Sequence, residues 1–281
     1  MTLRTLITAP DLHDLVVKGG VLVVDCRADL ADKPRAARDY AQAHVSGAVF
    51  ADLETDLSDL SKTGLGRHPL PDAAAFAAVL GRWGWTPGMP VVAYDDANGA
   101  LAAARLWWML RLAGEREIAV LDGGLGAWKS AGLPLESGVV ARTPTRVEVA
   151  FDPRQIVYTD ELCDALKAQR ILLLDARAAP RFRGEVEPID PVAGHVPGAR
   201  NRPFSDNLES DGRYKPAEKL RAELTALLGS RPPSDLVNMC GSGVTACHNL
   251  LAMEHAGLPG SRIYAPSWSG YIADRSRPVE R

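Results

Sequence analysis

A repeated pattern in the two halves of the chain constrains the fold more than any other feature. In the first half, Asp25-Cys26-Arg27 follows a short apolar run, and His44-Val45-Ser46-Gly47-Ala48 comes soon after it. Asp175-Ala176-Arg177 and Gly194-His195-Val196-Pro197-Gly198-Ala199 repeat this arrangement roughly 150 residues later. Such a period is too long for a solenoid and fits two tandem domains of ordinary size. We therefore predict two copies of one fold.

Short apolar runs alternate with segments of helical pattern in both halves. The expected strands are 21–26, 91–94, 118–121, 171–174, 236–239 and 262–265, and the expected helices are 10–18, 72–83, 100–112, 124–131, 159–168, 215–228 and 244–256. This alternation predicts an α/β fold in which each domain is a parallel sheet with helices on both faces. We expect domains at 1–135 and 159–281, joined by an extended linker at 136–158.

The composition excludes several classes of protein. The 281 residues include 32 Lys and Arg against 35 Asp and Glu, so no overall basic field indicates nucleic acid or a membrane surface as a partner. Residues 1–20 resemble neither a signal peptide nor a membrane span. The four cysteines show neither zinc-site spacing nor a disulfide framework. We expect a cytoplasmic protein with reduced thiols, no metal, no cofactor and a small-molecule substrate.

One cysteine occupies a chemically favourable position. The apolar run 236–239 leads directly into Cys240, and the small residues Gly241, Ser242 and Gly243 then precede a helical segment. Unpaired backbone N–H groups and the positive end of the helix dipole favour an anion at such a helix start. The two glycines let the backbone approach the sulfur closely. We therefore predict that Cys240 ionises readily and acts as a nucleophile.

When the two halves are aligned, Asp95 stands opposite Cys240. A carboxylate at this position cannot take up sulfur. We therefore expect the first domain to be non-catalytic and the second to carry the chemistry.

These motifs resemble the two-domain rhodanese superfamily over nearly the whole chain. The loop Cys240-Gly241-Ser242-Gly243-Val244-Thr245 is similar to that of the mercaptopyruvate sulfurtransferases, whereas the thiosulfate:cyanide sulfurtransferases typically carry basic residues after the cysteine. The resemblance implies that sulfane sulfur moves from 3-mercaptopyruvate through a Cys240 persulfide to an acceptor. That acceptor would be thioredoxin, a small thiol or cyanide.

The resemblance also implies roles for individual residues. Arg181 would bind the substrate carboxylate, and Arg183 is a second candidate because the family's other substrate-binding arginine is replaced near residues 187–190. Ser242 and His44, with Asp32 or Asp39, would form a proton relay. The remaining expected substrate contacts come from the loop: Gly241, Gly243, Val244 and Thr245.

Three other functions compete with this interpretation. The nearest is a thiosulfate:cyanide sulfurtransferase, and a more remote one is a non-catalytic regulatory module with the same fold. Some phosphatases also share the fold, but they need an arginine that closes a C-x5-R loop, and Ala246 stands at that place. The presence of Cys240 in one of the two copies argues against the regulatory module.

Overall fold

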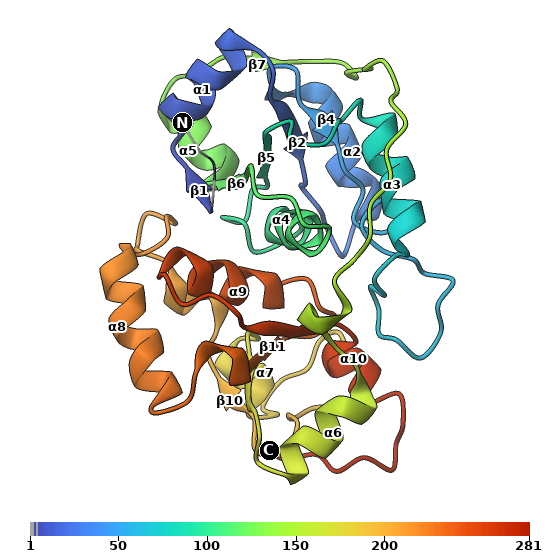
Figure 1. Cartoon of the computed structure of the whole chain (residues 1–281), viewed down its shortest axis with the longest axis vertical. Helices are drawn as coiled ribbons and strands as arrows, with labels where there is room; N and C mark the ends of the chain where they lie inside the picture. Colours follow the sequence, from blue (N-terminus) through green and yellow to red (C-terminus); the bar gives the residue numbers. More distant parts are fainter. Residues whose placement is uncertain (1–2, 4) are drawn as a thin grey trace. The chain divides into compact units, whose positions relative to one another are not determined.

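The computed structural model describes residue 3 and residues 5–281, and the chain forms two compact units (Figure 1). The first unit contains Met1–Asp59, Leu70–Asp152 and Asp211–Arg213, and the second contains Leu60–Pro69, Pro153–Ser210 and Tyr214–Arg281. The segment Leu60–Pro69 lies in the first half of the sequence, yet it packs as part of the second unit.

The first unit is built on a five-stranded parallel sheet. Its strand order is β1 (Leu6–Ile7), β6 (Ile118–Leu121), β5 (Val91–Tyr94), β2 (Leu22–Asp25) and β4 (Val49–Phe50). A short antiparallel pair, β3 (His44–Val45) and β7 (Leu135–Glu136), completes the unit. The longer strands are buried along their whole length, as expected for a parallel sheet covered on both faces.

The second unit repeats this topology. Its strand order is β8 (Ile156–Val157), β12 (Arg262–Tyr264), β11 (Leu236–Met239), β9 (Leu172–Asp175) and β10 (Arg200–Asn201), all parallel. An isolated antiparallel bridge between His195 and Glu280 stands where His44 pairs with Glu136 in the first unit. The predicted duplication and α/β class are thus confirmed.

Helices cover both faces of each sheet. Residues of α1 and α5 join the strand side chains in one core cluster of the first unit, and these helices lie together in Figure 1. On the chain, α4 follows β5 and α9 follows β11, and both are buried nearly throughout. The helices are α1 (Ala9–Lys18), α2 (Lys33–Gln42), α3 (Ala73–Arg82), α4 (Ala103–Leu112), α5 (Gly124–Ser130), α6 (Thr159–Lys167), α7 (Ala179–Phe182), α8 (Ala217–Leu228), α9 (Ala246–His255) and α10 (Ser267–Tyr271), with 3₁₀ turns at Pro153–Gln155, Phe204–Asn207 and Pro233–Asp235.

A buried ion pair braces each sheet at the end of one strand. The Arg27 guanidinium donates to both carboxylate oxygens of Asp25, and its Nη2 also donates to the Ala43 carbonyl at 2.8 Å. Arg177 repeats these contacts with Asp175 and with the Gly194 carbonyl, again at 2.8 Å. The Asp-x-Arg repeat seen in the sequence is therefore part of the scaffold.

We predict that Arg27→Ala destabilises the first unit by about 3–5 kcal/mol, because it leaves the fully buried Asp25 carboxylate without its counter-ion. Urea unfolding followed by tryptophan fluorescence measures this effect, since five of the six tryptophans lie in the first unit. The control is Arg35→Ala, which removes two surface pairs, with Asp29 and with Asp39, and should cost less than about 1 kcal/mol. Equal losses in both variants would contradict the prediction.

Candidate active site

The loop Cys240–Thr245 joins the central strand β11 to helix α9. Cys240 is buried with 3% exposure, and its backbone N–H donates to Ser267 Oγ at 3.2 Å. Its carbonyl accepts from the Trp268 N–H at 3.0 Å, and the Gly241 carbonyl accepts from the Ser269 N–H at 2.9 Å. The first residues of α10 therefore fix the backbone of Cys240 and Gly241.

The backbone N–H groups of this loop are available to a ligand. Within residues 3 and 5–281, the N–H groups of Gly241, Ser242, Val244 and Thr245 have no hydrogen-bond acceptor. Unsatisfied N–H groups at the start of a helix form a site for an anion. The loop of the second unit thus offers hydrogen-bond donors next to Cys240.

In the equivalent loop of the first unit, the backbone N–H groups bind a carboxylate. The Asp95 carboxylate follows β5 and accepts from the N–H groups of Ala97 at 2.9 Å, Gly99 at 2.8 Å, and Leu101 and Ala103 at 3.2 Å each. Burial raises the pKa of Asp95 to about 6, and these hydrogen bonds act in the opposite direction. The first unit therefore fills its loop with its own carboxylate.

A serine and a histidine meet beside the cysteine loop. His68 Nδ1 lies 2.8 Å from Ser242 Oγ, and both side chains are almost completely buried. His68 belongs to the Leu60–Pro69 segment of the second unit. The sequence did not predict this residue, because a histidine in a Gly- and Pro-rich loop shows no pattern that links it to a serine 174 positions away.

The predicted His44 has a different role. It is fully buried in the first unit, its Nδ1 lies 2.8 Å from the Tyr40 carbonyl, and its ring stacks on Tyr40. His195 makes the same contacts with Phe182 in the second unit. Because both copies share this arrangement, we assign it to bracing the turn, and His68 replaces His44 as the partner of Ser242.

The two aspartates considered for the relay also lie elsewhere. Asp32, which precedes α2, pairs with Arg38, and Asp39 of α2 pairs with Arg35. These contacts stabilise the surface of the first unit. They give neither carboxylate a role in the relay.

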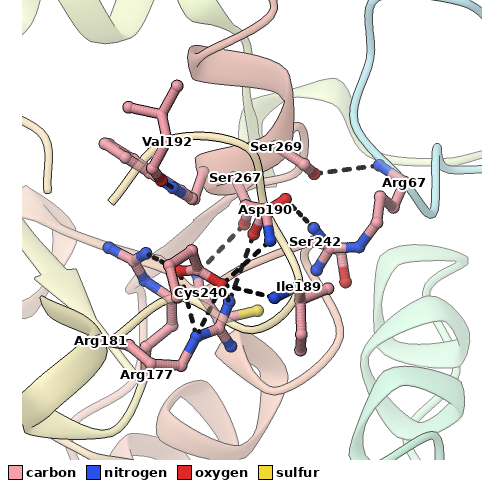
Figure 2. A network of polar contacts seen from close by, with 12 residues as sticks. Arg67, Arg177, Arg181, Ile189, Asp190, Val192, Cys240, Ser242, Ser267 and Ser269 are labelled. Atoms are coloured by element: carbon pink, nitrogen blue, oxygen red, sulfur yellow. Dashed lines mark hydrogen bonds and ion pairs between the residues drawn. The ribbon is translucent and has the colours of Figure 1, made fainter. Parts of the chain in front are cut away.

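Two arginines face the cysteine loop. A Cβ atom added at Gly241 would lie 3.0 Å from Arg67 Nη2 and 3.7 Å from Arg181 Nη2. Both guanidinium groups bind Asp190: Arg67 Nη1 donates to Oδ1, and Arg181 Nη2 donates to Oδ2 at 3.3 Å. Figure 2 shows Asp190 between Arg67 and the arginines Arg177 and Arg181. A glycine at position 241 leaves room for both cations.

Arg181 has a second acidic partner, Glu187. Arg181 Nη2 donates to Glu187 Oε1 at 2.6 Å, and the N–H groups of Ile189 and Asp190 donate to the same oxygen. Burial favours the neutral acid, but the hydrogen bonds from Arg181 and the backbone outweigh it and lower the pKa of Glu187. Glu187 is therefore a permanent counter-ion that orients Arg181.

Arg183, the second predicted substrate contact, turns away from this cluster. Its Nε donates to Glu185 at 2.6 Å, and about half of each side chain is exposed. Arg67 and Asp190 were not predicted from the sequence, because the pair joins residues 123 positions apart.

In the part of the chain that the structure describes, no cluster of three or more His, Cys, Asp or Glu side chains is arranged to bind a metal ion. Nor does any helix of that part combine the length and apolarity that a membrane crossing requires.

Comparisons with known proteins agree with this architecture. The model of the rhodanese-like domain matches residues 8–131 and 158–274. A Pseudomonas aeruginosa protein named probable 3-mercaptopyruvate sulfurtransferase is 50% identical over an alignment of 281 positions, which covers 99% of this chain and 99% of the relative. SseB of Mycobacterium tuberculosis, named as a candidate thiosulfate sulfurtransferase, is 40% identical over 99% of this chain and 97% of its own. The solved structure of 3-mercaptopyruvate sulfurtransferase from Leishmania major matches with a TM-score of 0.85 and 34% identity, over 97% of this chain and 75% of that one.

We predict that the pH dependence of stability differs between the wild type and Asp95→Asn. The pKa of Asp95 is about 6 in the folded protein against an ordinary value of 3.8, so the folded state binds the extra proton between these values. The proton on Asp95 therefore stabilises the folded state. This stabilisation is fully present below pH 3.8 and is lost as the pH rises through 6, so the free energy of unfolding of the wild type falls by about 3 kcal/mol over this range.

The measurement is the difference in the free energy of unfolding between the two proteins at several pH values from 4 to 7. Because the variant cannot titrate at this position, the wild type should lose stability relative to it as the pH rises. Parallel pH profiles would contradict the prediction.

Proposed function

The chain belongs to the rhodanese-like domain family, and from this premise we propose that it is a sulfurtransferase that takes sulfur from 3-mercaptopyruvate. The observation that carries the proposal is the pair of equivalent loops. One loop is closed by the Asp95 carboxylate, and the other presents the Cys240 thiol beside N–H groups that have no acceptor in the described chain. The names of the relatives from Pseudomonas aeruginosa and Leishmania major support the choice of donor.

The first half-reaction loads the cysteine. The Cys240 thiolate attacks the sulfur of the donor, an S–S bond forms, and the C–S bond breaks with its electron pair passing to the pyruvate enolate. The loop N–H groups stabilise the negative charge on the persulfide. A proton must then reach the enolate carbon to give pyruvate, and Ser242 with His68 at 2.8 Å can deliver it.

The second half-reaction discharges the cysteine. An acceptor thiolate attacks the outer sulfur of the persulfide, the S–S bond breaks, and Cys240 returns as a thiolate. The acceptors proposed for this step are thioredoxin, a small thiol or cyanide. The first unit is proposed to be non-catalytic, within the domain limits 1–135 and 159–281 that the sequence suggests.

The substrate carboxylate is proposed to bind between the arginines that face the loop. Arg181 is oriented by Glu187, and its guanidinium lies beside Gly241. The loop residues Gly241, Gly243, Val244 and Thr245 provide the backbone against which the donor would lie. Arg183 is left out of this proposal because its guanidinium is paired with Glu185 at the surface.

A thiosulfate sulfurtransferase is the second candidate, because the Mycobacterium tuberculosis relative carries that name. The same cysteine and the same persulfide would serve this reaction. The donors differ in charge, since thiosulfate is a dianion and mercaptopyruvate is a monoanion.

We predict that incubation with 3-mercaptopyruvate adds one sulfur atom to Cys240 and that Cys240→Ser abolishes both this adduct and sulfur transfer. Mass spectrometry of the intact protein and of its peptides identifies the site. Cys247→Ser is the matched control, because its thiol donates to the Gly243 carbonyl within the same segment and has no proposed part in the reaction. Retention of activity by Cys240→Ser would refute the mechanism.

We predict that His68→Ala lowers kcat about 10²- to 10⁴-fold, because the proton relay through Ser242 is lost. His195→Ala is the control, since its Nδ1 binds the Phe182 carbonyl in a turn of the same unit. Steady-state kinetics with 3-mercaptopyruvate and an excess of thiol acceptor test the difference. A kcat for His68→Ala equal to that of the wild type would exclude His68 from proton transfer.

A further inference from the structure

Asp190 has an unusual set of partners. Its side chain is only 3% exposed, and in the described chain its carboxylate accepts from Arg67 and Arg181 alone, one oxygen to each. Glu187, by contrast, also accepts from the backbone N–H groups of Ile189 and Asp190. The Asp190 carboxylate is therefore held by the two guanidinium groups that face Gly241, and the backbone does not stabilise its charge.

Several features show that this charge is costly where it stands. Burial raises the pKa of Asp190 above its ordinary value, and the neighbouring Glu187 acts in the same direction against the attraction of the arginines. Arg67 does not depend on Asp190 for its backbone position, because its N–H donates to Ser269 Oγ at 3.0 Å. A purely structural anchor for this segment therefore exists without the carboxylate.

The Arg67 side chain is partly exposed, whereas that of Asp190 is nearly buried. Both residues line an open cavity of about 370 Å³, together with Ile189 and Ser269. An anionic donor at Cys240 would lie next to Gly241, which both guanidinium groups face, and would therefore meet the combined field of the two cations and this carboxylate. When Asp190 is ionised, its negative charge cancels one of the two positive charges of Arg67 and Arg181.

We propose that Asp190 selects the sulfur donor by its charge, lowering the positive potential over Gly241 so that a monoanionic donor is preferred to a dianionic one. The inference rests on the proposed function. Every negative charge on the donor interacts with the same carboxylate, so a dianion experiences twice the repulsion of a monoanion. Specificity then comes from an unfavourable contact with the wrong donor.

The test compares kcat/KM for thiosulfate and for 3-mercaptopyruvate in the wild type and in Asp190→Asn. The amide keeps an oxygen that accepts from an arginine, while the charge is removed. We expect the thiosulfate to mercaptopyruvate ratio of kcat/KM to rise about tenfold, which corresponds to about one charge interaction in a partly screened site. Glu185→Gln is the control, because it neutralises an exposed acid of the same segment that is paired with Arg183, and its ratio should equal that of the wild type.

A second variant keeps the inference testable if Asp190→Asn does not fold. Arg67→Gln removes one cation from the same pair and should move the ratio in the opposite direction, against thiosulfate. An unchanged or lower ratio in a folded Asp190→Asn protein, or an unchanged or higher ratio in Arg67→Gln, overturns the inference while leaving the sulfurtransferase intact. A wild type that is inactive with both donors overturns the proposed function and this inference together.

Discussion

The backbone N–H groups that follow the central strand of each sheet require an acceptor, and the rest of the site is arranged around this requirement. In the first unit, the Asp95 carboxylate accepts four of them, at 2.8 to 3.2 Å. In the second unit, Cys240 stands at the equivalent point, and four N–H groups of its loop have no acceptor among the described residues. The same fold thus carries one loop whose N–H groups bind its own carboxylate and one loop whose N–H groups have no acceptor in the described chain.

Comparison of the two units also distinguishes contacts that maintain the fold from contacts that are specific to the cysteine site. Contacts that occur in both units, such as Asp25 with Arg27 and Asp175 with Arg177, maintain the fold. The contacts of His44 and His195 belong to this class, and for this reason the proposed relay does not include His44. The contact between Ser242 and His68 has no counterpart in that repeat, and it lies next to the cysteine.

The cations and acids near Gly241 form a balanced cluster. Glu187 orients Arg181 and stays ionised, whereas Asp190 joins Arg67 to Arg181 in a buried position that disfavours its charge. Ion pairs of this kind contribute little to stability after their desolvation is subtracted. Their value to the protein is better understood as control of the potential that an anionic donor meets at the loop.

The sequence by itself determined the duplicated α/β fold and its central strands, and it singled out Cys240 and Arg181 as candidate site residues. The fold and the position of Cys240 follow from local patterns, because a buried parallel strand is a short apolar run and a helix start after it is marked by small residues. Arg181 was identified from the family resemblance. The exposed helix α2 was missed, since only Ala36 and Tyr40 of its ten residues are buried and its apolar face is too narrow to recognise. The pairing of Ser242 with His68 and of Asp190 with Arg67 was decided by the tertiary structure alone. Those contacts join segments 174 and 123 positions apart, and only the packing of Leu60–Pro69 with the second unit brings the side chains together.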